Sequence, residues 1–256
     1  MTMNSPSLLA LFAVLAAAGN ATAATITPVL QIGFDGTLVG TTYTPASGEL
    51  VTNGTFAANG TPTVGGGTAS IDGSVAVNAS ADGFKYSITL GSLAGTNWVA
   101  EAIFAFDTFG TGQRTLIDVQ GDTDFRVNNA GNGLQAVYWD GTVAGSTSAA
   151  LPATGTYLHY ALVWDATATS LTAYLGGVSI GTVNNNAFST PDLTNISFGY
   201  LGRSGNVGRG VDGSLDAVSF GTFTGTFDPT ADFLIPEPSA ALLGLLGFLP
   251  FLRRRR

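Results

Sequence analysis

The sequence predicts an all-β sandwich, and three observations support this fold class. Short runs that alternate apolar and polar residues recur through the middle of the chain, as in strands with one buried face. Only 10% of the residues are charged, which disfavours amphipathic surface helices. Glycine is abundant at 35 residues, and Asp-Gly or Asn-Gly pairs punctuate the runs at 35–36, 53–54, 59–60, 72–73, 82–83, 140–141 and 212–213. Such pairs are typical of hairpin turns.

The alternation marks the strands most clearly in the second half of the chain. We expect them at 98–106, 114–119, 125–127, 134–139, 157–164, 170–175, 178–183, 196–200 and 213–220. No window has a helical period, although a short helical turn fits residues 229–233. The length between the two ends suits one domain over residues 24–228, followed by a linker at 229–235.

Composition excludes several classes of function. The chain has no cysteine, so it has no disulfide framework, thiolate metal site or cysteine nucleophile. The net charge of -8 includes four arginines at the C-terminal end, and the rest of the chain contributes only five basic residues: Lys85, Arg114, Arg126, Arg203 and Arg209. Such an acidic domain repels phosphate backbones, so nucleic-acid binding is disfavoured.

The N-terminal 23 residues are typical of a secretory signal peptide. An apolar, Ala-rich stretch precedes small residues at Ala21 and Ala23, which suit cleavage by signal peptidase after Ala23. No Lys or Arg precedes the apolar stretch. The alternative interpretation is a buried helix at the start of the domain.

The C-terminal end, residues 236–256, has three parts. Pro236, Glu237 and Pro238 come first, an apolar helix is predicted at 239–252, and Arg253, Arg254, Arg255 and Arg256 end the chain. The apolar run is shorter than the about 20 residues that cross a bilayer. The arginines favour a cytoplasmic end, and the prolines keep the triplet extended outside the membrane. A temporary tether therefore fits better than a permanent anchor.

This order of parts resembles the PEP-CTERM sorting signal of Gram-negative bacteria. The resemblance implies that an exosortase recognises the signal and removes the helix near the triplet. It also implies transient insertion of the precursor in the inner membrane, followed by release or attachment at the cell surface. Bacteria with this signal often make exopolysaccharide and biofilm.

A second resemblance covers residues 34–220. An aromatic, a histidine, an apolar strand and an aspartate at 157–165 precede a strand, a glycine turn and a return strand at 170–181. Residues 196–203 and 213–219 resemble a closing section, and 97–104 an early core strand. Together they resemble laminin-G-like and concanavalin A-like lectin domains. The resemblance implies a jelly-roll sandwich, here flanked by the signal peptide and the C-terminal helix.

Catalysis is weakly supported by the residues. A retaining glycosidase needs two carboxylates about 5–5.5 Å apart, but the only glutamates before the sorting signal are Glu49 and Glu101. Asp122 and Asp124 form an i, i+2 pair at an apparent turn. His159, the only histidine, lies in an apolar strand, where a packing role is commoner than a catalytic one. We therefore expect no enzymatic activity.

Calcium is the one cofactor that the sequence suggests. Asp118, Asp122 and Asp124 lie close in sequence around Gly121, and hard oxygen ligands suit calcium. Laminin-G-like domains often hold calcium at a loop rim. A solvated acidic loop without metal is the open alternative.

The sequence thus predicts an exported surface or extracellular-matrix protein with a non-catalytic jelly-roll module. Its expected partners are signal peptidase, an exosortase and either exopolysaccharide or surface proteins. Two alternatives stay open. One is an extracellular glycan-processing hydrolase on the same fold, and the other is a purely structural or adhesive coat protein.

Overall fold

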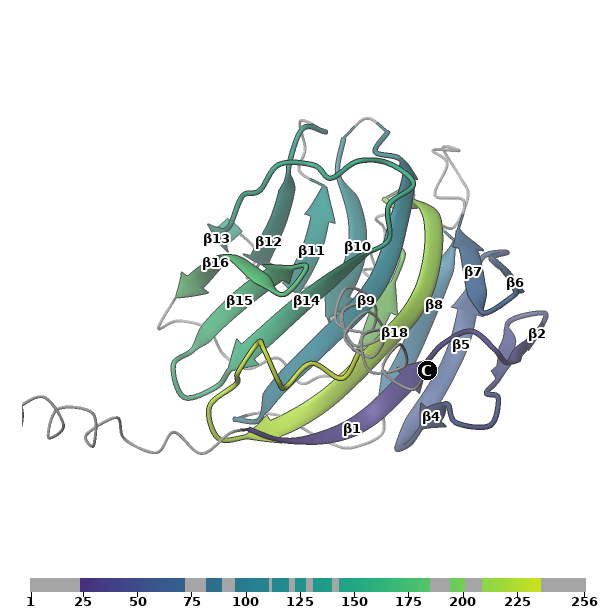
Figure 1. The fold of residues 1–256 in the computed structure, drawn as a ribbon, viewed down its shortest axis with the longest axis horizontal. Coiled ribbons are helices and arrows are strands. Elements are labelled where there is room, and N and C mark those ends of the chain that lie inside the picture. The colour runs from purple at the N-terminus through teal and green to yellow at the C-terminus, as the bar shows by residue number, and fades with distance from the viewer. Residues whose placement is uncertain are drawn as a thin grey trace, which may run out of the picture.

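The computed structural model describes residues 24–71, 82–88, 95–110, 112–119, 123–127, 131–139, 143–184, 194–200 and 209–235. It confirms the all-β sandwich: two sheets stack face to face, every strand pairing is antiparallel, and the described residues contain no helix (Figure 1). Correspondingly, no helix among the described residues is long and apolar enough to cross a membrane. The predicted signal peptide and sorting signal, residues 1–23 and 236–256, lie outside the described residues.

The first sheet has nine strands. Its main order is β16 (Val178–Asn184), β15 (Ser170–Leu175), β14 (Leu158–Asp165), β9 (Asn97–Thr108), β18 (Asp212–Thr224), β1 (Thr25–Ile32) and β4 (Leu50–Val51). In addition, β7 (Thr68–Ile71) pairs with β18, and β6 (Thr63–Gly65) pairs with β7.

The second sheet also has nine strands and lies behind the first in Figure 1. Its order is β13 (Val143–Ser146), β12 (Leu134–Trp139), β11 (Thr123–Val127), β10 (Arg114–Val119), β17 (Asn195–Phe198), β8 (Gly83–Ile88), β5 (Gly54–Asn59), β3 (Thr42–Thr44) and β2 (Thr37–Val39). Neighbours such as β10 and β17 are far apart in sequence, so the chain crosses repeatedly between the sheets.

All nine predicted strands are present. The bounds of β10, β12 and β15 agree with the prediction, and the other six differ by a few residues at their ends. The prediction missed all eight strands before residue 97, as well as β13. Most of these are short, and β2, β3 and β4 have three, three and two residues. Such elements carry too few residues to show a period of two.

Two of the Asx-Gly pairs lie at crossings between the sheets rather than in hairpins. The pair at 35–36 lies where the chain passes from β1 in the first sheet to β2 in the second, and the pair at 53–54 lies between β4 and β5, which also belong to different sheets. Two tight hairpins instead use paired glycines. Gly66 and Gly67 have φ of 63° and 77°, and Gly176 and Gly177 have φ of 56° and 73°. Positive φ at both central residues is the geometry of a type I′ turn.

The core lies between the sheets and is rich in aromatic residues. Tyr160 of β14 meets Phe125 of β11 edge to face, with ring centroids 5.5 Å apart. Because these strands belong to different sheets, the contact joins the two layers. In the first sheet, Trp98 and Trp164 stack at 6.5 Å and are almost fully buried. The domain therefore has a packed interior, which leaves only the outer faces of the sheets for polar chemistry.

Gly213 is a position where the fold requires glycine. Its φ is +154°, and a Cβ atom there would lie 2.0 Å from the carbonyl oxygen of Ala105 in the neighbouring strand. We expect Gly213→Ala to lower the free energy of unfolding by about 3 kcal/mol through strain and overpacking. Urea unfolding measures this change. Gly65→Ala is the control because a Cβ atom there has no neighbour within 4 Å. Equal midpoints for the two variants would contradict the register of β9 and β18.

Candidate functional site on the outer face of the second sheet

A row of mainly polar side chains crosses the outer face of the second sheet. In β10 and β17, the side chains of Ile117, Val119, Ile196 and Phe198 belong to the core, so the alternate residues point outward. Strand register aligns these outward residues across five strands: Val137, Asp124, Asp118, Ser197 and Lys85, in the order β12, β11, β10, β17 and β8. Together with Gln113, Thr115, Arg126 and Arg209, described below, these residues are called the polar belt.

A carboxylate pair lies in the middle of the polar belt. Asp118 and Asp124 face each other across β10 and β11, and both are buried. Their side chains are in hydrogen-bond contact. Burial raises the pKa of Asp124 above its ordinary value of 3.8, although Asp118, Arg126 and Arg209 act in the opposite direction. Whether Asp124 carries a negative charge therefore depends on its neighbours Asp118, Arg126 and Arg209.

Two arginines lie beside the carboxylate pair. Arg126 of β11 is 7% exposed, and its Nη1 atom lies 3.4 Å from Oδ2 of Asp124, which is a long contact for an ion pair. Arg209 comes from the segment before β18 and interacts electrostatically with both Asp124 and Arg126. Its carbonyl accepts a 2.8 Å hydrogen bond from the backbone N–H of Thr115, the residue opposite Arg126. This bond places Arg209 at the end of β10.

Several buried polar atoms of the belt have no hydrogen-bond partner among the described residues. They are Oδ1 of Asp124, Nε of Arg126, Nε2 of Gln113 and Oγ1 of Thr115. Buried polar groups are nearly always paired, so this concentration in one place requires an explanation. Because these atoms are enclosed, water or an ion held within the belt is the partner that such groups usually have.

The structure brings together two of the three predicted calcium ligands. Asp118 and Asp124 meet, but on the sheet face and beside Arg126 rather than at a loop rim. Asp122 lies outside the described residues. Within the described residues, no group of three or more Asp, Glu or His side chains is arranged to hold a metal ion. Calcium at this position remains a prediction that depends on Asp122.

The outer face of the first sheet carries a second polar group, centred on Glu101. The side chains of Glu101 and His159 are both fully buried, and His159 Nε2 lies 2.9 Å from Glu101 Oε2. The backbone N–H groups of Leu234 and Ile235 donate to Glu101 at 2.9 and 3.1 Å. Glu101 therefore holds the chain that follows β18, residues 225–235, which is called the strap.

The strap includes residues 229–235, which were predicted to be a linker, and these residues pack on the domain. Phe233 packs edge to face on His159 at 4.6 Å and also contacts Tyr174 and Phe227. Ile235 is 9% exposed. At the start of this segment, the N–H groups of Ala231 and Asp232 donate to the carbonyl of Asp228, which closes one turn near the predicted helical turn. The packed domain thus extends to residue 235, because apolar residues of the strap cover the outer face of the sheet.

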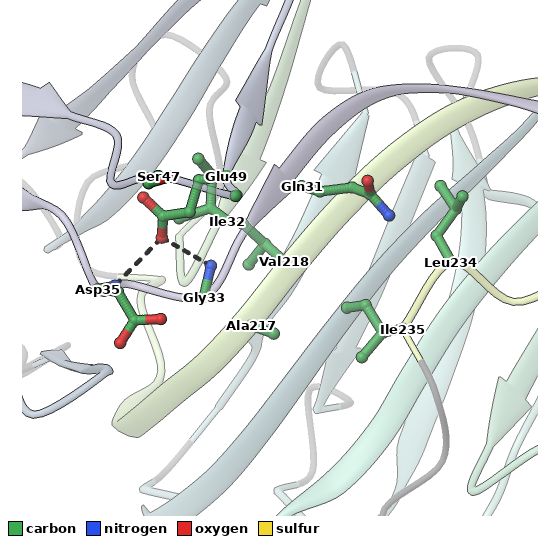
Figure 2. A pocket seen from close by; sticks show the side chains of 11 residues that line it. Gln31, Ile32, Gly33, Asp35, Ser47, Glu49, Ala217, Val218, Leu234 and Ile235 are labelled. Atoms are coloured by element: carbon green, nitrogen blue, oxygen red, sulfur yellow. Dashed lines mark hydrogen bonds between the residues drawn. The ribbon is translucent and has the colours of Figure 1, made fainter.

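A pocket of about 400 Å³ adjoins the strap. Figure 2 shows Leu234 and Ile235 on one side, Glu49 and Gly33 on the other, and Gln31 and Val218 between them. Glu49 accepts hydrogen bonds from the N–H groups of Gly33, Asp35 and Ala46 and from the hydroxyl of Tyr43. Burial, together with the bond to Glu49, raises the pKa of Tyr43. Glu49 therefore holds the wall of the pocket in place.

Sequence reasoning did not select Gln113, Arg126 or Arg209 as site residues. A signal was present, because these arginines are two of only five basic residues outside the C-terminal tail of an acidic chain. The sequence did not show that the two arginines lie close together, because Arg209 comes from a segment far from β11 in the chain. His159 is packed, as predicted, although its bond to Glu101 was not anticipated.

The antiparallel two-sheet sandwich, with polar side chains gathered on one outer face, defines a lectin-type jelly-roll domain. A family model described as the concanavalin A-like lectin/glucanases superfamily matches residues 81–222, which is more than half of the chain. The chain belongs to this superfamily. No curated protein matched the sequence.

Several solved structures are similar at low sequence identity, and one with a TM-score above 0.5 supports the fold. The crystal structure of HCR/D-Sa-GBL1/C has a TM-score of 0.54 and is 8% identical, over 76% of this chain and 48% of that one. Sialidase CBM40 of Ruminococcus gnavus bound to α2,3-sialyllactose is 16% identical, with a TM-score of 0.41 over 49% of this chain and 75% of that one. Trypanosoma rangeli sialidase with sialic acid is 14% identical, with a TM-score of 0.49 over 75% of this chain and 30% of that one.

Proposed function

We propose that this chain is an exported surface or extracellular-matrix protein whose jelly-roll domain binds polysaccharide without catalysis. The observation that carries the proposal is the polar belt, which gathers carboxylate, hydroxyl, amide and guanidinium groups on one outer face of the sandwich. Sugar hydroxyls donate and accept hydrogen bonds, so they match a surface that offers both carboxylate oxygens and N–H groups. Superfamily membership is consistent with this ligand class but does not select it.

Export and sorting complete the proposal. Signal peptidase removes residues 1–23 after Ala23, and the C-terminal helix holds the precursor transiently in the inner membrane. An exosortase then cleaves near Pro236, Glu237 and Pro238. In support, the strap packs on the domain up to Ile235, the residue directly before the triplet. Cleavage there leaves the domain and its strap intact.

The two glutamates support a role without catalysis. Glu49 accepts from three backbone N–H groups and from Tyr43, and Glu101 is bonded to His159 and to two N–H groups of the strap. These bonds occupy both carboxylates with structural partners. A glycosidase needs carboxyl groups that face the substrate with room for the scissile bond.

A glycan-processing hydrolase is the second candidate, because Asp118 and Asp124 do form a close pair on a sheet face. Their side chains are in hydrogen-bond contact, whereas the two mechanisms of glycoside hydrolysis need separations of about 5 Å or more. Reducing-sugar release from bound polysaccharides tests this candidate. Release that disappears in Asp118→Asn and Asp124→Asn would establish an enzyme and contradict our proposal.

Polysaccharide binding itself is tested on a glycan array with the purified protein. We expect Asp124→Asn to weaken binding about tenfold, because a charge-assisted hydrogen bond to a sugar hydroxyl is lost. Asp107→Asn is the matched control, since Asp107 is exposed at the end of β9 in the other sheet. Self-association without affinity for any glycan would instead favour a purely structural coat protein.

A further inference from the structure

We infer that the pocket beside the strap binds amino-sugar units of a polysaccharide through their protonated amino groups. The pocket lies on the outer face of the first sheet, so it is separate from the polar belt on the second sheet. The inference rests on the proposed function only in taking a polysaccharide as the ligand. It adds a second site and a chemical class for the sugar.

The pocket is an accessible cavity between two separate parts of the chain. Its volume is about 400 Å³, which lies in the range of small-ligand pockets. Figure 2 shows Asp35 on one side of it and Leu234 and Ile235 of the strap on the other. Of the other polar residues that line it, Ser47 is exposed, as Asp35 is, and Gln31 is partly exposed. A ligand can therefore reach these side chains from solvent.

A missing Cβ atom leaves room in the wall beside Asp35. Gly33 lines the pocket and does not have a left-handed φ, so its backbone conformation does not require glycine. A Cβ atom at this position would lie 3.5 Å from Oδ2 of Asp35 and 4.0 Å from Oε1 of Glu49, which are ordinary van der Waals distances. Both carboxylates therefore border the same space, and glycine leaves that space to the pocket.

This wall is negatively charged, and its charge is not neutralised within the described part of the chain. The carboxylate of Asp35 has no hydrogen-bond or ion-pair partner among the described residues. Asp216 lies near it, because burial and then the charge of Asp35 raise the pKa of Asp216. The described lysine and arginine residues all lie in the second sheet or bond to its end: Lys85, Arg114, Arg126 and Arg209. The local potential therefore attracts a cation.

The hydrogen bonds of Glu49 favour an ammonium group over a bare metal ion. Both of its oxygens already accept, from three backbone N–H groups and from the hydroxyl of Tyr43. Calcium needs several oxygen atoms in direct contact, and those of Glu49 are occupied. An ammonium group needs fewer acceptors. It can donate to the carboxylate of Asp35 while Glu49 attracts it at longer range.

The remaining lining groups explain why the amine belongs to a sugar. The amide of Gln31 and the hydroxyl of Ser47 both donate and accept hydrogen bonds, as sugar hydroxyls do. Leu234 and Ile235 supply apolar surface for the C–H groups of a ring. An amino sugar presents an ammonium group, hydroxyls and an apolar ring face in one unit. Each wall of the pocket thus has a matching group, whereas a lysine side chain would use only the charged wall.

The test compares oligomers that differ in the charge and setting of the amino group. A hexamer of β-1,4-linked glucosamine, its N-acetylated form and a lysine hexamer are each titrated into the purified full chain by calorimetry, at about pH 5.5, where the amines are protonated. We expect the glucosamine hexamer to bind about tenfold or more tightly than the N-acetylated form, because acetylation removes a charge-assisted hydrogen bond. The lysine hexamer should bind more weakly than the glucosamine hexamer, since it lacks hydroxyls.

Two variants connect this selectivity to the pocket. Asp35→Asn removes the accessible charge and should weaken binding of the glucosamine hexamer about tenfold. Asp107→Asn is its matched control, because Asp107 is exposed in the same sheet and does not line the pocket. Gly33→Ala narrows the wall without changing its charge and should weaken binding by a similar factor of about ten. Gly65→Ala is the control for this change, since a Cβ atom there has no neighbour within 4 Å. Circular dichroism checks that each variant folds.

The remaining outcomes overturn the inference in distinguishable ways. Equal binding of the glucosamine and N-acetylated hexamers, or binding of neither, would remove the amino-sugar ligand, and polysaccharide binding through Asp124 would still be decided on the glycan array. A lysine hexamer that binds as tightly as the glucosamine hexamer would assign the pocket to a protein partner. Selectivity that both Asp35→Asn and Gly33→Ala retain would place the site elsewhere. Equal losses in Asp35→Asn and Asp107→Asn would reduce the effect to general attraction by an acidic protein.

Discussion

Replacing Glu101 with alanine is expected to lower the midpoint of thermal unfolding by about 10 °C. The fully buried carboxylate bonds His159 and the N–H groups of Leu234 and Ile235, so its removal breaks three hydrogen bonds at once. A buried polar group that loses its hydrogen-bond partner typically costs about 1–3 kcal/mol. For a domain of this size, each kcal/mol shifts the midpoint by about 2–4 °C. Differential scanning calorimetry of the purified protein measures the change.

Two controls isolate the bond to the strap. Glu101→Gln keeps the shape of the side chain and one acceptor oxygen, so it should lose less stability than the alanine variant. Asp107→Asn changes an exposed carboxylate on the same strand and should behave like the unaltered protein. If Glu101→Ala unfolds at the same temperature as Asp107→Asn, the strap is not held by this residue.

The second large effect concerns sorting. Glu237→Ala, or deletion of Arg253 to Arg256, should leave nearly all of the precursor in the inner membrane. In the proposed sorting scheme, a carboxylate at position 237 resists entry into the bilayer and so limits the apolar helix, and the arginines favour a cytoplasmic C-terminus. Intact mass of the protein from the membrane, the cell surface and the medium locates both processing sites in one measurement.

A charge-conserving control accompanies the deletion. Replacing the four arginines with four lysines preserves the positive charge, so release should continue. A released species that begins near Ala24 and ends near the triplet is the expected product of the unaltered chain. Unchanged release of both Glu237→Ala and the arginine deletion would contradict the sorting assignment, and a surface species that retains Arg256 would indicate a permanent membrane anchor.

The two effects are expected to be separable. Glu101 acts on residues 234 and 235, which precede the triplet, and Glu237 lies within it. A protein with Glu101→Ala should therefore lose stability even after it has been correctly processed. A protein with Glu237→Ala should unfold at the normal temperature while remaining in the membrane. If both variants changed both properties, the strap and the sorting signal would form one unit.

Local pattern was enough to predict most strands of the second half of the chain. β10, β12 and β15 each have six residues, which is long enough for their apolar content to mark them as strands, and their predicted bounds agree with the structure. The shorter strands near the N-terminus could not be read, because elements of two to four residues show no period. The turns were partly misread. An Asx-Gly pair favours positive φ, but that preference is the same in a hairpin and in a crossing between sheets.

The sequence by itself determined the all-β class, the absence of cysteine chemistry, the acidic balance and the order of the sorting motifs, since each of these depends on composition or on neighbouring residues. Only the tertiary structure decided which polar groups meet. Strand register brings Asp118 opposite Asp124, and a segment 83 positions after Arg126 supplies Arg209. Glu101 is likewise 58 residues from His159 and 133 from Leu234. A strand's period is local, whereas the choice of its partner and register depends on burial of the whole core, and so no single segment encodes the site.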